Sequence, residues 1–111
     1  MKMFKVLLFS SLVSVSAAQA ASFDCDKALG LDEKAICASR SLSDKDVEMV
    51  TKYQFLRGLF AMGTRGEMQD RQQSWLAQRK QCGSNVDCLS QSYQTRIAEL
   101  DDMYQHINKP L

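Results

Sequence analysis

The chain carries a helical hydrophobic period that no internal proline interrupts, since its only proline, Pro110, lies next to the C-terminus. A few glycines are the only residues between 31 and 107 that disfavour a helix. The strict alternation of a half-buried strand does not appear. The helical period is clearest near the C-terminus, in the series Val86, Leu89, Tyr93, Ile97, Leu100, Tyr104 and Ile107. The pattern therefore predicts an all-α fold.

Four helices are expected, over about 31–39, from Ser43 or Asp44 to Met62, over 66–81 and from 84 or 85 to about 107. Ser43 is a favourable N-cap, and Asp44 and Asp46 would then lie in the first turn. The run Gly63-Thr64-Arg65-Gly66 has the composition of a turn between the second and third helices. We predict a small up-down bundle of one short and three longer helices.

The N-terminus has the order of a secretory signal peptide. Lys2 and Lys5 are followed by an apolar run over 6–15 and then by Ala18-Gln19-Ala20, whose small residues suit a signal peptidase. We expect residues 1–20 to be removed and residues 21–111 to form one domain. The apolar run is about half the length needed to span a bilayer, so no stable membrane anchor is expected after cleavage.

Cleavage leaves all four cysteines, Cys25, Cys37, Cys82 and Cys88, in the exported domain. An even set in an oxidising compartment indicates two disulfides. Three pairings are possible, and the clustering favours the local one, Cys25–Cys37 with Cys82–Cys88. Zinc ligands are usually two to four residues apart, whereas these pairs are separated by eleven and five residues, so no metal is expected.

Charge is nearly balanced in the exported domain but unevenly distributed. Without Lys2 and Lys5 the chain has 12 basic and 13 acidic residues, a balance that argues against nucleic acid as a partner. Residues 21–50 carry a net charge of −3, residues 51–82 carry +4 and residues 83–111 carry −2. This segregation is typical of solvated helix faces and can also form a docking surface.

Candidate catalytic groups are few. The single histidine, His106, falls at the end of the last expected helix. Glu67 and Asp70 share one helix face, but nearby arginines and lysines explain them as surface ion pairs. Because no phosphate loop or nucleophile motif is present, we predict a binding protein that is not an enzyme and has no cofactor.

Two stretches of the chain resemble the LprI-type lysozyme inhibitor family. They are Phe23-Asp24-Cys25 with Asp32-Glu33-Lys34-Ala35-Ile36-Cys37, and the run from Arg71 to Cys82. The matched positions of the second stretch and beyond are Gln72, Trp75, Leu76, Arg79, Cys82, Cys88, Leu89, Tyr93 and Arg96, with Leu42, Asp46 and Tyr53 fitting more loosely. Gln73 and Met49 depart from the family pattern, which has arginine and leucine there.

The resemblance implies a bacterial domain, periplasmic or secreted, that binds lysozyme and protects peptidoglycan. The alternative is an envelope structural or interaction module, for example an accessory subunit of a secretion or stress system, without lysozyme binding. A lysozyme cleft holds two carboxyl groups, so the loop Gly63, Thr64, Arg65 and Gly66 is the candidate partner-binding protrusion. The acidic 21–50 segment could steer a basic lysozyme.

Five side chains are expected to hold the bundle together, namely Asp46, Trp75, Arg79, Tyr93 and Arg96. We expect Trp75 in the core. We expect the two arginines to pair with carboxylates such as Asp46 or Asp24.

Overall fold

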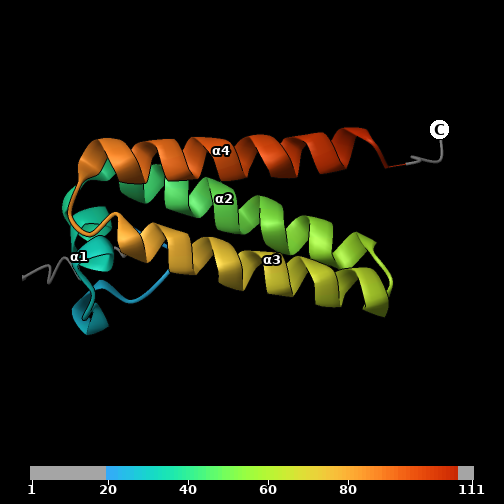
Figure 1. Cartoon of the computed structure of the whole chain (residues 1–111), viewed down its shortest axis with the longest axis horizontal. Coiled ribbons are helices and arrows are strands. Elements are labelled where there is room, and N and C mark those ends of the chain that lie inside the picture. Colours follow the sequence, from blue (N-terminus) through green and yellow to red (C-terminus); the bar gives the residue numbers. More distant parts are fainter. Residues whose placement is uncertain (1–19, 108–111) are drawn as a thin grey trace, which may run out of the picture.

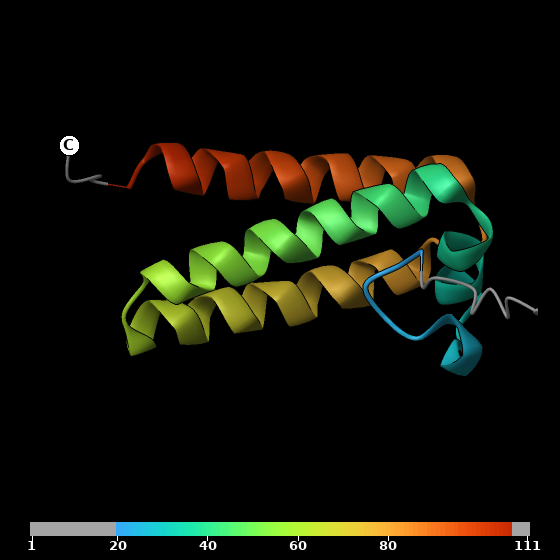
Figure 2. The same ribbon diagram turned by 180° about the vertical axis from the view of Figure 1, so that it is seen from behind.

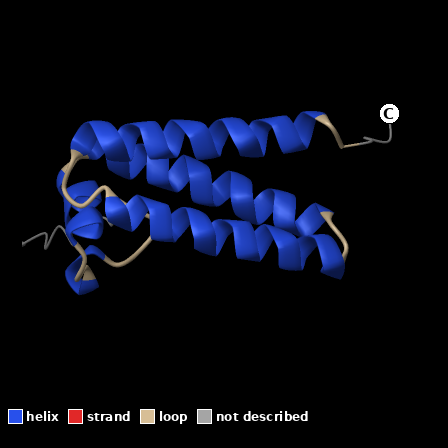
Figure 3. Cartoon of the chain, viewed as in Figure 1, coloured by secondary structure: helices blue, strands red, loops and turns tan. Residues whose placement is uncertain are grey.

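A computed structural model describes residues 20–107, which form a helical bundle (Figures 1 and 3). A 3-10 turn, η1 (Cys25–Lys27), is followed by α1 (Leu31–Ala38), α2 (Arg40–Leu59), α3 (Met62–Gln81) and α4 (Val86–Gln105). One short and three longer helices make up the regular structure of these residues, which confirms the predicted all-α class. The expected signal peptide, apart from Ala20, lies outside the described residues.

The three long helices run alternately, so that α2 and α4 are parallel and α3 is antiparallel to both (Figures 1 and 2). Two contacts show the parallel register. Lys45 Nζ donates to Ser90 Oγ at 2.9 Å, and Lys52 Nζ lies 2.7 Å from Asp101 Oδ1 further along both helices. The short α1 packs at the end where α2 and α4 begin, which we call the near end. The other end, with the α2–α3 turn, is the far end.

The start of α2 differs from the prediction. Ser39 is the N-cap and its Oγ accepts from the Leu42 amide at 3.2 Å, so the helix begins four residues before Asp44. Ser43 is wholly buried within α2, and its hydroxyl donates to the carbonyl of Ile36 at 2.6 Å. The hydroxyl that suggested a cap therefore ties α2 to α1.

The predicted loop Gly63-Thr64-Arg65-Gly66 is wrong, because these residues form the first turn of α3. The connection between α2 and α3 is only Phe60-Ala61. The Arg65 amide already donates to the carbonyl of Ala61 at 3.0 Å, as in an α-helix. Of the glycines that the structure describes, only Gly83 has a positive φ, at 57°, where it ends α3.

Both predicted local disulfides are confirmed, and both lie at the near end. Cys25–Cys37 joins η1 to α1 with a Cα–Cα distance of 5.8 Å. Cys82–Cys88 joins the end of α3 to the start of α4 with a Cα–Cα distance of 5.5 Å. Two such bonds indicate an oxidising environment outside the cytoplasm.

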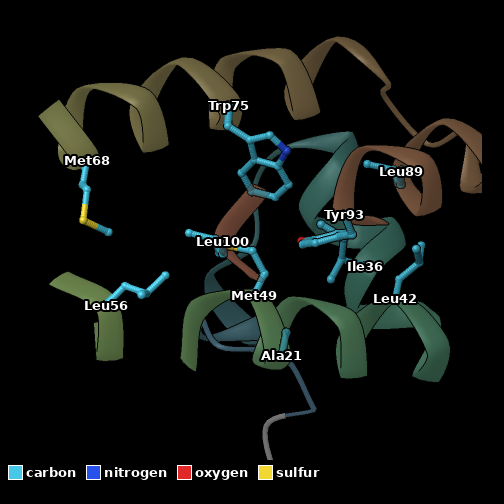
Figure 4. Close-up of a cluster of buried hydrophobic side chains, with 10 residues drawn as sticks. All are labelled: Ala21, Ile36, Leu42, Met49, Leu56, Met68, Trp75, Leu89, Tyr93 and Leu100. Carbon is cyan, nitrogen blue, oxygen red and sulfur yellow. The ribbon is translucent and has the colours of Figure 1, made fainter. Parts of the chain in front are cut away.

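The hydrophobic core runs along the contact between the three long helices and includes α1 (Figure 4). Its buried members are Ala21, Ile36, Leu42, Met49, Leu56, Met68, Trp75, Leu89, Tyr93 and Leu100. The buried stripe of α3 is unusual because polar Gln72 and Arg79 alternate with Met68 and Trp75 at helical spacing. The core of this bundle is therefore partly polar.

Candidate functional site

A buried carboxylate, Asp46, joins three segments at the near end. Its exposed fraction is 1%, yet both oxygens have partners. Tyr93 donates its hydroxyl proton to Oδ1 at 2.8 Å. Ser22 donates its amide to Oδ2 at 2.7 Å and its hydroxyl to the same oxygen at 2.5 Å. The N-terminal segment, α2 and α4 thus meet on one side chain.

The guanidinium of Arg79 lies beside this cluster. Its Nε donates to Asp32 Oδ2 at 3.0 Å, and its Nη1 donates to the Tyr93 hydroxyl at 3.3 Å. Nη1 also lies 3.8 Å from Asp46 Oδ1. The rings of Phe23 and Trp75 each have their centroid 5.7 Å from the guanidinium carbon, which is a cation–π distance. One arginine on α3 therefore contacts two acids and two aromatic rings.

Burial and close partners together set the ionisation of this cluster. Desolvation and the negative charge of Asp46 raise the pKa of the Tyr93 hydroxyl far above its ordinary value. Desolvation opposes the charge on Arg79, but Tyr93 and Asp32 outweigh it, so the pKa of Arg79 lies above its ordinary value. Tyr93 therefore stays a neutral donor and Arg79 stays a cation.

A second polar chain crosses from α4 to α3 and α2. Arg96 Nε donates to Gln72 Oε1 at 3.0 Å, and Gln72 Nε2 lies 3.2 Å from the sulfur of Met49. The other side of Arg96 donates from Nη1 to Glu99 Oε2 at 3.0 Å. No buried side-chain nitrogen or oxygen of the described residues lacks a partner. These groups satisfy one another, which is the arrangement of a structural network.

Four of the five predicted structural residues, Asp46, Trp75, Arg79 and Tyr93, lie together in the first cluster, and Arg96 belongs to the second polar chain. Arg79 lies beside Asp46, one of the carboxylates expected for the arginines, whereas Arg96 pairs with Glu99. Asp24 instead accepts from the amide of Asp26 at 3.0 Å, as the cap of η1. Two members, Asp32 and Gln72, were not predicted as partners of the arginines. For Gln72 the signal was helical spacing, because it lies between Met68 and Trp75 on one face of α3, whereas no local pattern indicated Asp32.

An apolar hollow lies between α2 and α4 toward the far end. Its volume is about 310 Å³, and it is lined by Lys52, Phe55, Leu56, Leu100, Asp101 and Tyr104. The rings of Phe55 and Tyr104 are tilted against each other with centroids 6.1 Å apart, and they are 58% and 41% exposed. Lys52 lies at the other border of the hollow. The hydrogen bond that it makes with Asp101 is the main cause of the raised pKa of Lys52.

The far end of the α2–α3 hairpin, which we call the tip, consists of Leu59, Phe60, Ala61 and Met62. Leu59 is 50% exposed and Met62 is 84% exposed. Arg57 and Arg65 line one small hollow beside the tip, and Arg65 Nε donates to the carbonyl of Phe60 at 2.9 Å. Arg65 thus closes the end of α2 while remaining exposed.

The exposed charge is distributed differently from the charge in the sequence. Asp32 and Asp46 are buried, so the 21–50 segment exposes or half-exposes five acidic and four basic side chains and is nearly neutral. By contrast, α4 has Arg96 as its only arginine or lysine, and that side chain is buried. Its carboxylates, Asp87, Glu99, Asp101 and Asp102, face solvent fully or in part. The acidic face of the molecule is therefore α4.

The candidate catalytic groups lie on two helices. His106 ends α4 and lies 3.4 Å from Asp102, with its ring largely exposed. Glu67 and Asp70 lie on α3, three residues apart on one face. In the part of the chain that the structure describes, no group of three or more histidine, cysteine or acidic side chains could hold a metal ion.

Comparisons of the chain with protein-family models, with curated proteins and with solved structures find no match. Three features of the described residues bear on function. These are the closed polar network of the near end, the apolar hollow beside the acidic face of α4, and the exposed tip.

Proposed function

We propose that this chain is an exported binding protein and that it inhibits lysozyme through the face formed by α2 and α4 toward the far end. One observation carries the proposal, namely that two exposed aromatic rings border an apolar hollow on the side of the molecule where carboxylates are exposed. Aromatic side chains around a small pocket are the usual anchors of a protein interface.

The charge of α4 suits a basic partner. Animal-type lysozymes are strongly basic, and a row of carboxylates on one helix would accelerate their approach. Asp101 and Asp102 lie three and two residues before Tyr104 in the sequence, with Asp101 lining the hollow itself. This face replaces the 21–50 segment as the steering surface, because the acidic excess of that segment is largely buried.

The dimensions of the face suit the covering of a cleft. A helix of 20 residues is about 30 Å long, which is comparable with the length of a cleft that holds several sugar rings. The resemblance to the LprI-type family supports lysozyme as the partner.

The test is the lysis of a cell-wall suspension by several lysozymes, followed by turbidity, with the oxidised exported protein added. We expect lysis to slow, and Phe55→Ala to weaken inhibition by about tenfold or more, as loss of an interface anchor does. Leu29→Ala is the matched control, because Leu29 is an exposed apolar residue near η1. Undiminished lysis at micromolar excess would remove lysozyme as the partner.

A charge variant tests the steering role separately. Asp102→Lys should lower the association rate with a basic lysozyme at low salt, and the difference should shrink as salt is added. Asp26→Lys places the same change on η1 at the near end and should have less effect. Equal effects of the two variants would show that α4 is not the docking face.

A further inference from the structure

We propose that the tip of the α2–α3 hairpin docks on an anionic membrane surface. This inference goes beyond lysozyme binding and concerns a different surface of the molecule. It places the exported protein at the face of a bilayer, with the disulfide-bonded near end pointing away from the lipid.

The first argument is the exposed apolar surface of the tip. Leu59, Ala61 and Met62 are exposed and Phe60 is half-buried, so four consecutive apolar residues form the turn. Met62 and Leu59 have large apolar side chains that are mostly or half exposed, so packing of the bundle does not require apolar residues at these two positions. A contiguous exposed apolar patch of this kind marks a contact surface.

The second argument is charge complementarity. Between Glu48 and Glu67 there are 18 residues without a carboxylate, and they include Arg57 and Arg65 as well as Lys52, which pairs with Glu48 and Asp101. Arg57 and Arg65 lie together beside the tip. Cationic side chains around an apolar protrusion suit anionic headgroups above an acyl layer.

The third argument is shape. The tip is the convex end of a helical hairpin (Figures 1 and 2), and a fluid interface accepts a convex apolar end without a matching groove. Among the described helices none is long and apolar enough to cross a membrane. The contact is therefore peripheral, with Met62 and Leu59 entering the interface and the arginines at the level of the phosphates.

The test is co-sedimentation of the exported protein with vesicles that contain phosphatidylglycerol, compared with vesicles of phosphatidylcholine alone, at about 0.1 M salt. We expect binding to the anionic vesicles and at least fivefold weaker binding to the neutral ones. Met62→Glu should reduce the partition by about tenfold or more, because a carboxylate replaces the most exposed side chain of the tip. Leu29→Glu, the same kind of change near η1, should leave binding unchanged.

A second pair of variants separates charge from hydrophobicity. Arg57→Gln should reduce binding to the anionic vesicles about fivefold, as expected for one cation near the headgroups. Arg40→Gln removes an exposed arginine at the near end and should have little effect. Circular dichroism should show that all four variants keep the helical fold, since each changes an exposed side chain.

Three results would overturn the proposal. One is the absence of binding to anionic vesicles, and another is an equal loss of binding in Met62→Glu and Leu29→Glu. The third is a Met62→Glu variant that loses lysozyme inhibition but still binds vesicles, which would assign the tip to a protein partner. Failure of lysozyme inhibition with intact vesicle binding would overturn only the proposed function.

Discussion

The hydroxyl of Tyr93 donates a 2.8 Å hydrogen bond to Asp46 across 47 residues of sequence. This contact joins α4 to α2, and the second oxygen of the same carboxylate receives both bonds from Ser22. Arg79 adds the third long helix through the Tyr93 hydroxyl. One buried acid therefore organises the near end of the bundle.

Removing this acid should be costly. Asp46→Ala leaves the donors of Ser22 and Tyr93 without their acceptor and removes a negative charge near Arg79. We expect the free energy of unfolding to fall by about 3–5 kcal/mol, as for other broken buried networks. Urea denaturation of the oxidised protein measures it. Asp44→Ala, an exposed acid on the same helix, should change it by less than about 0.5 kcal/mol.

The raised pKa of Tyr93 predicts a loss of stability at alkaline pH. The hydroxyl stays protonated in the folded protein, whereas in the unfolded chain it ionises at its ordinary pKa of 10.0. Stability from this group is complete below pH 10 and falls as the pH rises above it.

Tyr93→Phe isolates this contribution, because phenylalanine cannot ionise. Above pH 10 the free energy of unfolding of the parent protein should fall more steeply than that of the variant, by up to about 1.4 kcal/mol per pH unit. Urea denaturation between pH 8 and pH 11.5 gives both slopes. Parallel slopes would mean that Tyr93 ionises equally easily in the folded and unfolded states.

Two glycine-to-alanine changes should have opposite effects. Gly83 has a φ of 57°, so Gly83→Ala should cost about 1 kcal/mol or more. Gly66 lies in α3, and an added Cβ there meets nothing within 4 Å, so Gly66→Ala should stabilise by about 0.5–1 kcal/mol. Melting temperatures of the two variants decide this. A destabilised Gly66→Ala variant would instead support the loop that the sequence predicted for residues 63–66.

The two disulfides should contribute unequally. Cys25–Cys37 spans 12 residues and Cys82–Cys88 spans 6. Loop-closure entropy then gives about 3 kcal/mol for the first bond and about 2 kcal/mol for the second. Replacing both cysteines of one disulfide with alanine, and then those of the other, gives two variants. Urea denaturation of each measures the loss in the free energy of unfolding. A larger loss at Cys82–Cys88 would show that closure entropy does not dominate.

Much of the fold could be predicted from local patterns. The spacing from Val86 to Ile107 gave α4 to within two residues of its end, and clustering gave the disulfide pairing. Asn85 as a cap was among the predicted starts of α4. These features depend on residues close in sequence, which is why a single sequence can reveal them.

The errors arose where long-range contacts decide the outcome. Ser43 has the side chain of a cap, but its hydroxyl bonds the carbonyl of Ile36 once α1 folds against α2. The glycines of the 63–66 segment favour a turn, but the helix extends through them and Phe60-Ala61 suffices for the connection. The pairing of Asp32 with Arg79 joins residues 47 positions apart, and no local pattern contains it.

Both disulfides and the Asp46 cluster lie at one end, so the bundle has unequal resistance to opening along its length. The far end has no covalent closure, and Gly58, Gly63 and Gly66 further weaken its helices. Backbone amides around the tip should therefore exchange with solvent through local opening, while those near Leu89 and Tyr93 should exchange only on global unfolding. The surfaces assigned to partners thus belong to the part of the molecule that can adjust its shape, and the near end acts as a fixed base.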